Sequence, residues 1–108
     1  MEKIKESTIE EVLREQVKKL GGLAYKFVSP GNDGVPDRIV IFPGKTPIFV
    51  ELKTDTGKLS RLQRVQIDRL QKLGQQVEVV RGMRGLKQFF EGQGYMDAAS
   101  WIATRFDL

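Results

Sequence analysis

The stretch "PDRIVIFPGKTPIFVELKTDTG", residues 36–57, decides the fold of this 108-residue chain. Two apolar, β-branched runs, 37–42 and 47–52, flank the short connector "PGKT", a pattern typical of a β-hairpin. Three charged side chains accompany these runs: Asp37 opens the first, and Glu51 and Lys53 stand at the end of the second. Because a charge beside a buried strand costs free energy unless it is paired or binds a ligand, these three residues require an explanation.

Around this hairpin the sequence predicts a mixed α/β order. An apolar stripe predicts a helix over residues 7–20, capped by Ser7 or Thr8 and ended by Gly21-Gly22. A strand over 23–28 and the glycine- and proline-rich loop 29–36 lead into the hairpin. A helix over 60–74, a strand over 76–80 and C-terminal helical segments follow, giving the order αβββαβα. The last strand is expected to join the sheet in parallel through a right-handed crossover.

Composition limits the chemistry that is available. There is no cysteine and no histidine, which excludes disulfides, thiol catalysis, Ser-His-Asp catalysis and histidine-ligated metals. The apolar runs are too short to cross a bilayer, and the first residues lack the apolar core of a signal peptide. We therefore expect a protein that stays where it is made, in the cytoplasm. Its chemistry must use carboxylates, lysine, hydroxyls or a hard, oxygen-ligated metal ion.

The net charge of +4 is concentrated in the middle of the chain. Residues 53–87 carry 9 basic and 3 acidic groups, whereas residues 1–52 carry 8 of each. Such a basic region suits a nucleic-acid backbone, although a solvated arginine-rich helix face would give the same pattern.

Strand alternation directs Glu51 and Lys53 to one side of the sheet, and the hairpin places Asp37 within about one residue of a position opposite Glu51. Two carboxylates that approach each other repel, and Mg²⁺ or Mn²⁺ would relieve that repulsion. The Leu52 carbonyl is a further hard ligand, and Lys53 could hold water or stabilise phosphate charge. The alternative is a simple salt bridge from Lys53 to Glu51 or Asp37.

Pro36-Asp37 followed by Glu51-Leu52-Lys53 resembles the PD-(D/E)xK nuclease signature. More narrowly, "KFVSPGNDGVPDRIVIFPG…FVELKTDTGKLSRLQ" resembles the VRR-NUC family of that superfamily, of the stand-alone phage and bacterial type. The resemblance covers about residues 7–91. It implies a single domain over residues 1–108, with a restriction-endonuclease-like αβββαβ core, a mixed sheet flanked by helices, and a C-terminal helical extension at about 92–108.

The resemblance also implies roles for particular residues. Asp37 and Glu51 would bind the metal with the Leu52 carbonyl, and Lys53 would be the catalytic lysine. The family's helix-one glutamate falls on Glu10, a metal ligand directly or through water, unless Glu10 forms a capping box with Ser7. Gln63, an amide on the apolar face of the second helix, is expected in the active site. A satisfied core amide is the alternative.

Seven further residues are candidates for DNA contacts. Arg61, Arg64, Arg69 and Lys72 lie on the outward side of the expected second helix, where phosphate contacts and plain solubilising charge are both reasonable. Lys26, Ser29 and Arg38 are expected to line a substrate channel. Gly31 and Gly34 would allow close approach of the loop to DNA, or provide turns only.

These observations favour a metal-dependent DNA endonuclease. Resemblance to stand-alone family members implies structure-selective cutting of branched DNA, as by a four-way (Holliday) junction resolvase, in a homodimer. The alternatives are a restriction-like, nicking or flap nuclease with the same active site, an inactive DNA-binding subunit, or a purely structural protein. The segment with Trp101, Ile102 and Phe106 would either form the dimer contact or pack back onto the domain.

Overall fold

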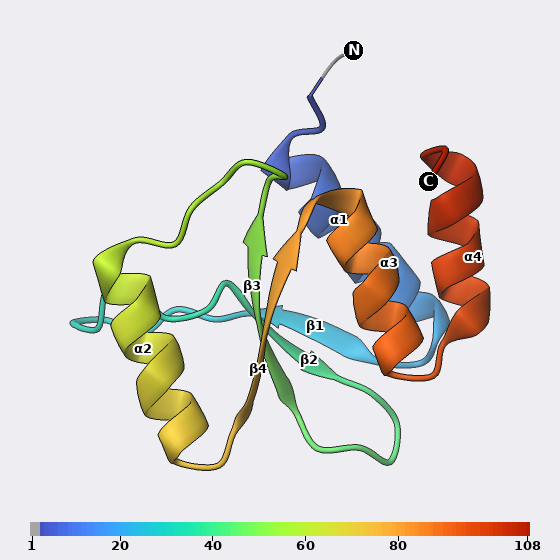
Figure 1. The fold of residues 1–108 in the computed structure, drawn as a ribbon. Helices are drawn as coiled ribbons and strands as arrows, with labels where there is room; N and C mark the ends of the chain where they lie inside the picture. The colour runs from blue at the N-terminus through green and yellow to red at the C-terminus, as the bar shows by residue number, and fades with distance from the viewer. Residues whose placement is uncertain (1–2) are drawn as a thin grey trace.

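The computed structural model describes residues 3–108, which form four helices and four strands (Figure 1). In chain order they are α1 (Glu6–Lys19), β1 (Leu23–Lys26), β2 (Arg38–Ile41), β3 (Ile48–Lys53), α2 (Arg61–Lys72), β4 (Gln76–Arg81), α3 (Gly82–Gly92) and α4 (Met96–Arg105). The predicted order and α/β class are confirmed.

One mixed sheet with the order β1-β2-β3-β4 forms the centre of the molecule. β2 and β3 pair antiparallel with Arg38 opposite Val50, so the predicted hairpin is confirmed. Extending that register by one residue sets Asp37 opposite Glu51. β4 pairs with β3 in parallel, and Lys53 lies beside Arg81 at the shared C-terminal end of the two strands.

Helices lie on both sides of the sheet: α1, α3 and α4 on one, and α2 on the other (Figure 1). The main core lies on the first side, where apolar residues of β2 and β3 pack against α1 and α3. Val50 and Leu52 point into this core, so alternation turns Glu51 and Lys53 toward the opposite face. The pattern "FVELK" thus separates the core residues of β3 from its charged ones.

The start of α1 differs from its prediction. The helix begins at Glu6 with Lys5 as its N-cap residue, and no side chain caps it. The expected cap by Ser7 or Thr8, with or without a Glu10 capping box, is therefore wrong. The earlier start places Glu6 in the first helical turn. For α2 the predicted Ser60 cap is confirmed, because Ser60 and Gln63 form a complete capping box.

The C-terminal helix α4 packs back onto the domain rather than projecting from it. Ala98, Ala99 and Ile102 belong to the main hydrophobic core, and the ammonium of Lys19 lies 5.3 Å from the Trp101 ring centre. Of the two roles considered for this segment, the structure shows internal packing. Within residues 3–108, no helix is both long and apolar enough to cross a membrane.

Candidate active site

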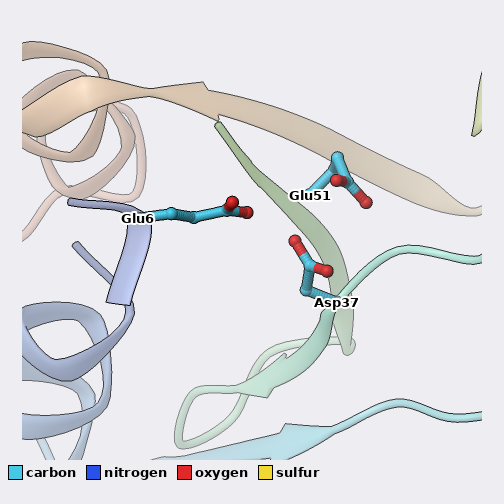
Figure 2. Close-up of side chains that lie close together, drawn as sticks. All are labelled: Glu6, Asp37 and Glu51. Atoms are coloured by element: carbon cyan, nitrogen blue, oxygen red, sulfur yellow. The ribbon is translucent and has the colours of Figure 1, made fainter. Parts of the chain in front are cut away.

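Three carboxylates from separate elements meet at the end of β3. Glu6 reaches in from the start of α1, Asp37 from the residue before β2, and Glu51 from β3 itself (Figure 2). One carboxylate oxygen from each lies within 4.8 Å of the other two. This spacing suits a shared divalent cation, since Mg²⁺ requires few protein carboxylates and keeps several water ligands.

Glu51 is the most buried member of the group, with 1 % of its surface exposed. Its Oε2 accepts a hydrogen bond from Gln63 Nε2 at 3.0 Å, while its Oε1 is buried with no hydrogen-bond partner. Burial, and next the Asp37 carboxylate, raise the pKa of Glu51 to about 7, although Lys53 acts in the opposite direction. A buried carboxylate oxygen without a donor is the type of atom that a cation would satisfy.

Asp37 is held in place by the backbone of the neighbouring strand. Its Oδ2 accepts a hydrogen bond from the Leu52 N–H at 2.8 Å. In an antiparallel ladder the N–H and C=O of one residue point to the same side, so the Leu52 carbonyl also faces the Asp37 side. This direction agrees with the ligand role expected for the carbonyl.

Lys53 and Gln63 approach the same carboxylate from different elements. Lys53 Nζ lies 3.5 Å from Glu51 Oε2, and its side chain is 16 % exposed. The Gln63 side-chain oxygen accepts from the Ser60 N–H at 2.8 Å, which fixes the orientation of the amide. The Gln63 NH₂ group therefore has to face Glu51. The structure brings together Asp37, Glu51, Lys53 and Gln63.

Glu10 is not part of this cluster. Its carboxylate binds the Arg38 guanidinium, which also donates to the Ala24 carbonyl at 3.1 Å. Glu6, one helical turn earlier, occupies the place that the sequence assigned to Glu10. The two glutamates are four residues apart on the same helix face, so helical spacing could not show which of them reaches the carboxylate cluster. An N-terminal boundary that included residue 6 in the helix would have made Glu6 a candidate.

Arg38 is also placed differently from its predicted role. Only 8 % of its surface is exposed, and its guanidinium joins β2 to α1 through Glu10. Burial lowers the pKa of Arg38, although an arginine remains charged at neutral pH. The DNA-contact prediction for Arg38 requires a surface position that the structure does not give it. Instead, the Glu10–Arg38 pair joins α1 to β2 one helical turn after Glu6.

The other predicted DNA contacts are distributed around the site. Lys26, with Glu6, Asp37 and neighbouring residues, lines a cavity of about 320 Å³. Arg61, Arg64 and Arg69 are exposed on α2, whereas Lys72 pairs with Asp68 at 2.9 Å. Ser29 is half-buried, and its hydroxyl accepts a hydrogen bond from Asn32.

Gly34 approaches another part of the protein closely. It has a φ of +89°, and a Cβ at this position would lie 2.6–2.8 Å from backbone atoms of Leu62 and Gln63. A Cβ at Gly31, by contrast, would meet nothing within 4 Å. The loop before β2 therefore packs against the first turn of α2 at Gly34, which helps to place Gln63 beside Glu51.

The two helix-one glutamates should respond differently to substitution. Glu6→Gln should raise the Mg²⁺ concentration for half-maximal DNA cleavage by about tenfold or more, with little change in stability. Glu10→Gln should leave the Mg²⁺ requirement unchanged and lower the free energy of unfolding by about 1–2 kcal/mol, because buried Arg38 loses a charged partner. Metal titration of cleavage and urea unfolding would measure these effects. The opposite pattern would restore Glu10 as the metal ligand.

Comparisons with known proteins agree with this architecture. The model of the VRR-NUC domain family matches residues 2–84. A protein of Acyrthosiphon pisum secondary endosymbiont phage 1, named "Putative nuclease p44", is 49 % identical over 80 residues, covering 74 % of this chain and 86 % of its own length. A solved VRR-NUC domain structure superimposes with a TM-score of 0.75 at 31 % identity, covering 80 % of this chain and 94 % of that one. The chain belongs to the VRR-NUC family.

Proposed function

We propose that this protein is a Mg²⁺- or Mn²⁺-dependent DNA endonuclease that hydrolyses phosphodiester bonds. The observation that carries the proposal is the meeting of Glu6, Asp37 and buried Glu51 beside Lys53, with one oxygen of Glu51 unsatisfied. A salt bridge between Lys53 and Glu51 alone would not explain that oxygen. Family membership and the nuclease name of the phage relative support the same conclusion.

The proposed roles of the site residues follow from their chemistry. Glu6, Asp37, Glu51 and the Leu52 carbonyl would hold the metal ion. A bound divalent ion would lower the pKa of a water molecule and neutralise charge on the phosphate. Gln63 holds Oε2 of Glu51 and leaves Oε1 for the cation.

Lys53 acts next to the carboxylate cage, by which we mean Glu6, Asp37 and Glu51. Its ammonium lies 3.5 Å from Glu51 and would orient the attacking water and stabilise the negative charge that develops on phosphate. Arg61, Arg64, Arg69 and Lys26 would provide sequence-independent contacts to the DNA backbone.

We further propose branched DNA as the substrate and a homodimer as the active form. The exposed arginines of α2 would contact the phosphate backbone, which carries no base sequence, so recognition of DNA shape is favoured over recognition of sequence. One active site cuts one strand, and a four-way junction needs two symmetric cuts. A two-fold dimer supplies both sites.

The test incubates the protein with a synthetic four-way junction, a flap, a linear duplex and a supercoiled plasmid, each with Mg²⁺, Mn²⁺ or EDTA. We expect cutting that depends on the metal and is fastest for the junction, with paired cuts in opposing strands. Lys53→Ala, purified in parallel, controls for a contaminating nuclease. Cutting in EDTA would refute the metal mechanism.

Two outcomes separate the finer parts of this proposal. Equal cutting of plain duplex would refute junction selectivity and favour a restriction-like nuclease, and flap-specific cutting would favour a trimming enzyme. Gel filtration with light scattering tests the dimer, and a monomer at the concentrations used for cleavage would refute it.

A further inference from the structure

The parallel pairing of β3 and β4 places a second cation beside the catalytic lysine. Lys53 and Arg81 are register partners, and each is the last residue of its strand. The arrowheads of β3 and β4 point in the same direction, and both strands end near the start of α1 (Figure 1). Neighbouring strands are about 4.8 Å apart, so the two backbones present their last side chains close together.

Strand alternation fixes the side to which Arg81 points. The preceding residue, Val80, is 2 % exposed and belongs to the main core, as does Leu52 before Lys53. Arg81 therefore lies on the opposite face, which is the face that carries Glu51 and Lys53. The two cations occupy equivalent positions at the end of adjacent strands.

The two cations differ in what they are bound to. Lys53 is mostly buried and its ammonium faces Glu51. Arg81 is exposed, and within residues 3–108 its side chain forms none of the ion pairs or hydrogen bonds seen in the structure. Asp55 lines the same cavity of about 570 Å³ as Arg81, but its carboxylate contacts Gly82. The guanidinium of Arg81 thus remains available to a ligand.

We infer that Arg81 binds a phosphate of the DNA strand being cut, next to the phosphate on which Lys53 acts. This inference rests on the proposed nuclease function and assigns it a phosphate-binding residue. A guanidinium suits the position because it stays charged and can contact two phosphate oxygens at once. Lys53 is directed toward the carboxylate cage, so a neighbouring phosphate needs another donor.

The test uses Arg81→Ala, Arg81→Lys and the control Arg84→Ala. Arg84 is also exposed and borders the same cavity, which lies along the edge strand β4, but it extends from α3, the helix that covers the core face of the sheet (Figure 1). The first measurement is binding of a four-way junction in EDTA at several salt concentrations. Arg81→Ala should reduce the slope of log K against log salt by about one, whereas Arg81→Lys and Arg84→Ala should keep the wild-type slope.

The second measurement is the rate of single-turnover cleavage with saturating enzyme and Mg²⁺. Arg81→Ala should be slower by about 10- to 100-fold, with Arg81→Lys in between and Arg84→Ala within about twofold of wild type. An unchanged slope and rate in Arg81→Ala, with Lys53→Ala inactive, would overturn the role of Arg81 and leave the nuclease proposal standing. A wild-type protein that cuts nothing would refute the nuclease proposal, and the salt slope would still decide whether Arg81 binds phosphate.

Discussion

Glu51→Gln should abolish metal-dependent cleavage, by about 1,000-fold, and should make the metal-free protein more stable above pH 7. The loss of cleavage follows from the loss of a buried anionic ligand at the centre of the cage. The gain in stability follows from the cost of burying that charge when no cation is bound. A substitution that removes activity and adds stability distinguishes a functional carboxylate from a structural ion pair.

The pH dependence of this effect has a defined sign. The pKa of Glu51 is about 7 in the folded protein against 4.5 for an ordinary glutamate. The folded state therefore binds a proton more tightly than the unfolded state does. The protonated Glu51 carboxyl makes its full contribution to the free energy of unfolding below about pH 4.5, and this contribution is lost as the pH rises through about 7. The loss amounts to about 3 kcal/mol.

Urea unfolding of wild type and Glu51→Gln, in EDTA between pH 4.5 and 8, measures this contribution. The carboxylates outside the site titrate in both proteins, so the difference between the two curves reports Glu51 together with Asp37, whose charge acts on it. We expect the free energy of unfolding of the variant to increase relative to that of wild type as the pH rises. Mg²⁺ should stabilise wild type alone. A difference curve that is flat with pH would contradict the buried, metal-linked role of Glu51.

The sequence predicts the hairpin and the placement of its charged side chains because both depend on local rules. Alternation of apolar and charged residues in "FVELK" places Glu51 and Lys53 on one face. The length of "PGKT" sets the register that brings Asp37 opposite Glu51. Gln63 was also identifiable, since it is a polar amide on a mainly apolar helix face and lies in the first turn, just after the strand that carries Lys53.

The residues whose positions differ from the prediction, or that sequence reasoning missed, lie where long-range packing decides. Choosing between Glu6 and Glu10 depends on how α1 lies over β2, and that in turn depends on the buried partner of Arg38. Strand alternation turns Arg38 to the core face opposite Val50 while Asp37 faces the site, but no local pattern shows that Glu10 is the partner of Arg38. The position of Arg81 likewise depends on the parallel register of β3 and β4, which joins residues 28 positions apart.

Lys53→Ala should reduce cleavage by about 100- to 10,000-fold while metal binding persists. Lysine is not a ligand of the cage, so Mg²⁺ should still raise the melting temperature of the variant. Lys53 does lower the pKa of Glu51, and its removal therefore raises that pKa further. Proton and metal compete for Glu51, so stabilisation by Mg²⁺ should appear at a higher pH in Lys53→Ala than in wild type.

Lys53→Arg separates charge from chemistry in the same experiment. The guanidinium keeps a positive charge near Glu51, so stabilisation by Mg²⁺ should return to the wild-type pH range. Cleavage should stay low, because the larger, planar group cannot take the position of a compact ammonium or exchange a proton with the attacking water. Thermal unfolding with and without Mg²⁺ from pH 6 to 9, and cleavage rates over the same range, test both effects. If Lys53→Ala cut DNA within about tenfold of wild type, the lysine would be an electrostatic partner of Glu51 and not a catalytic residue.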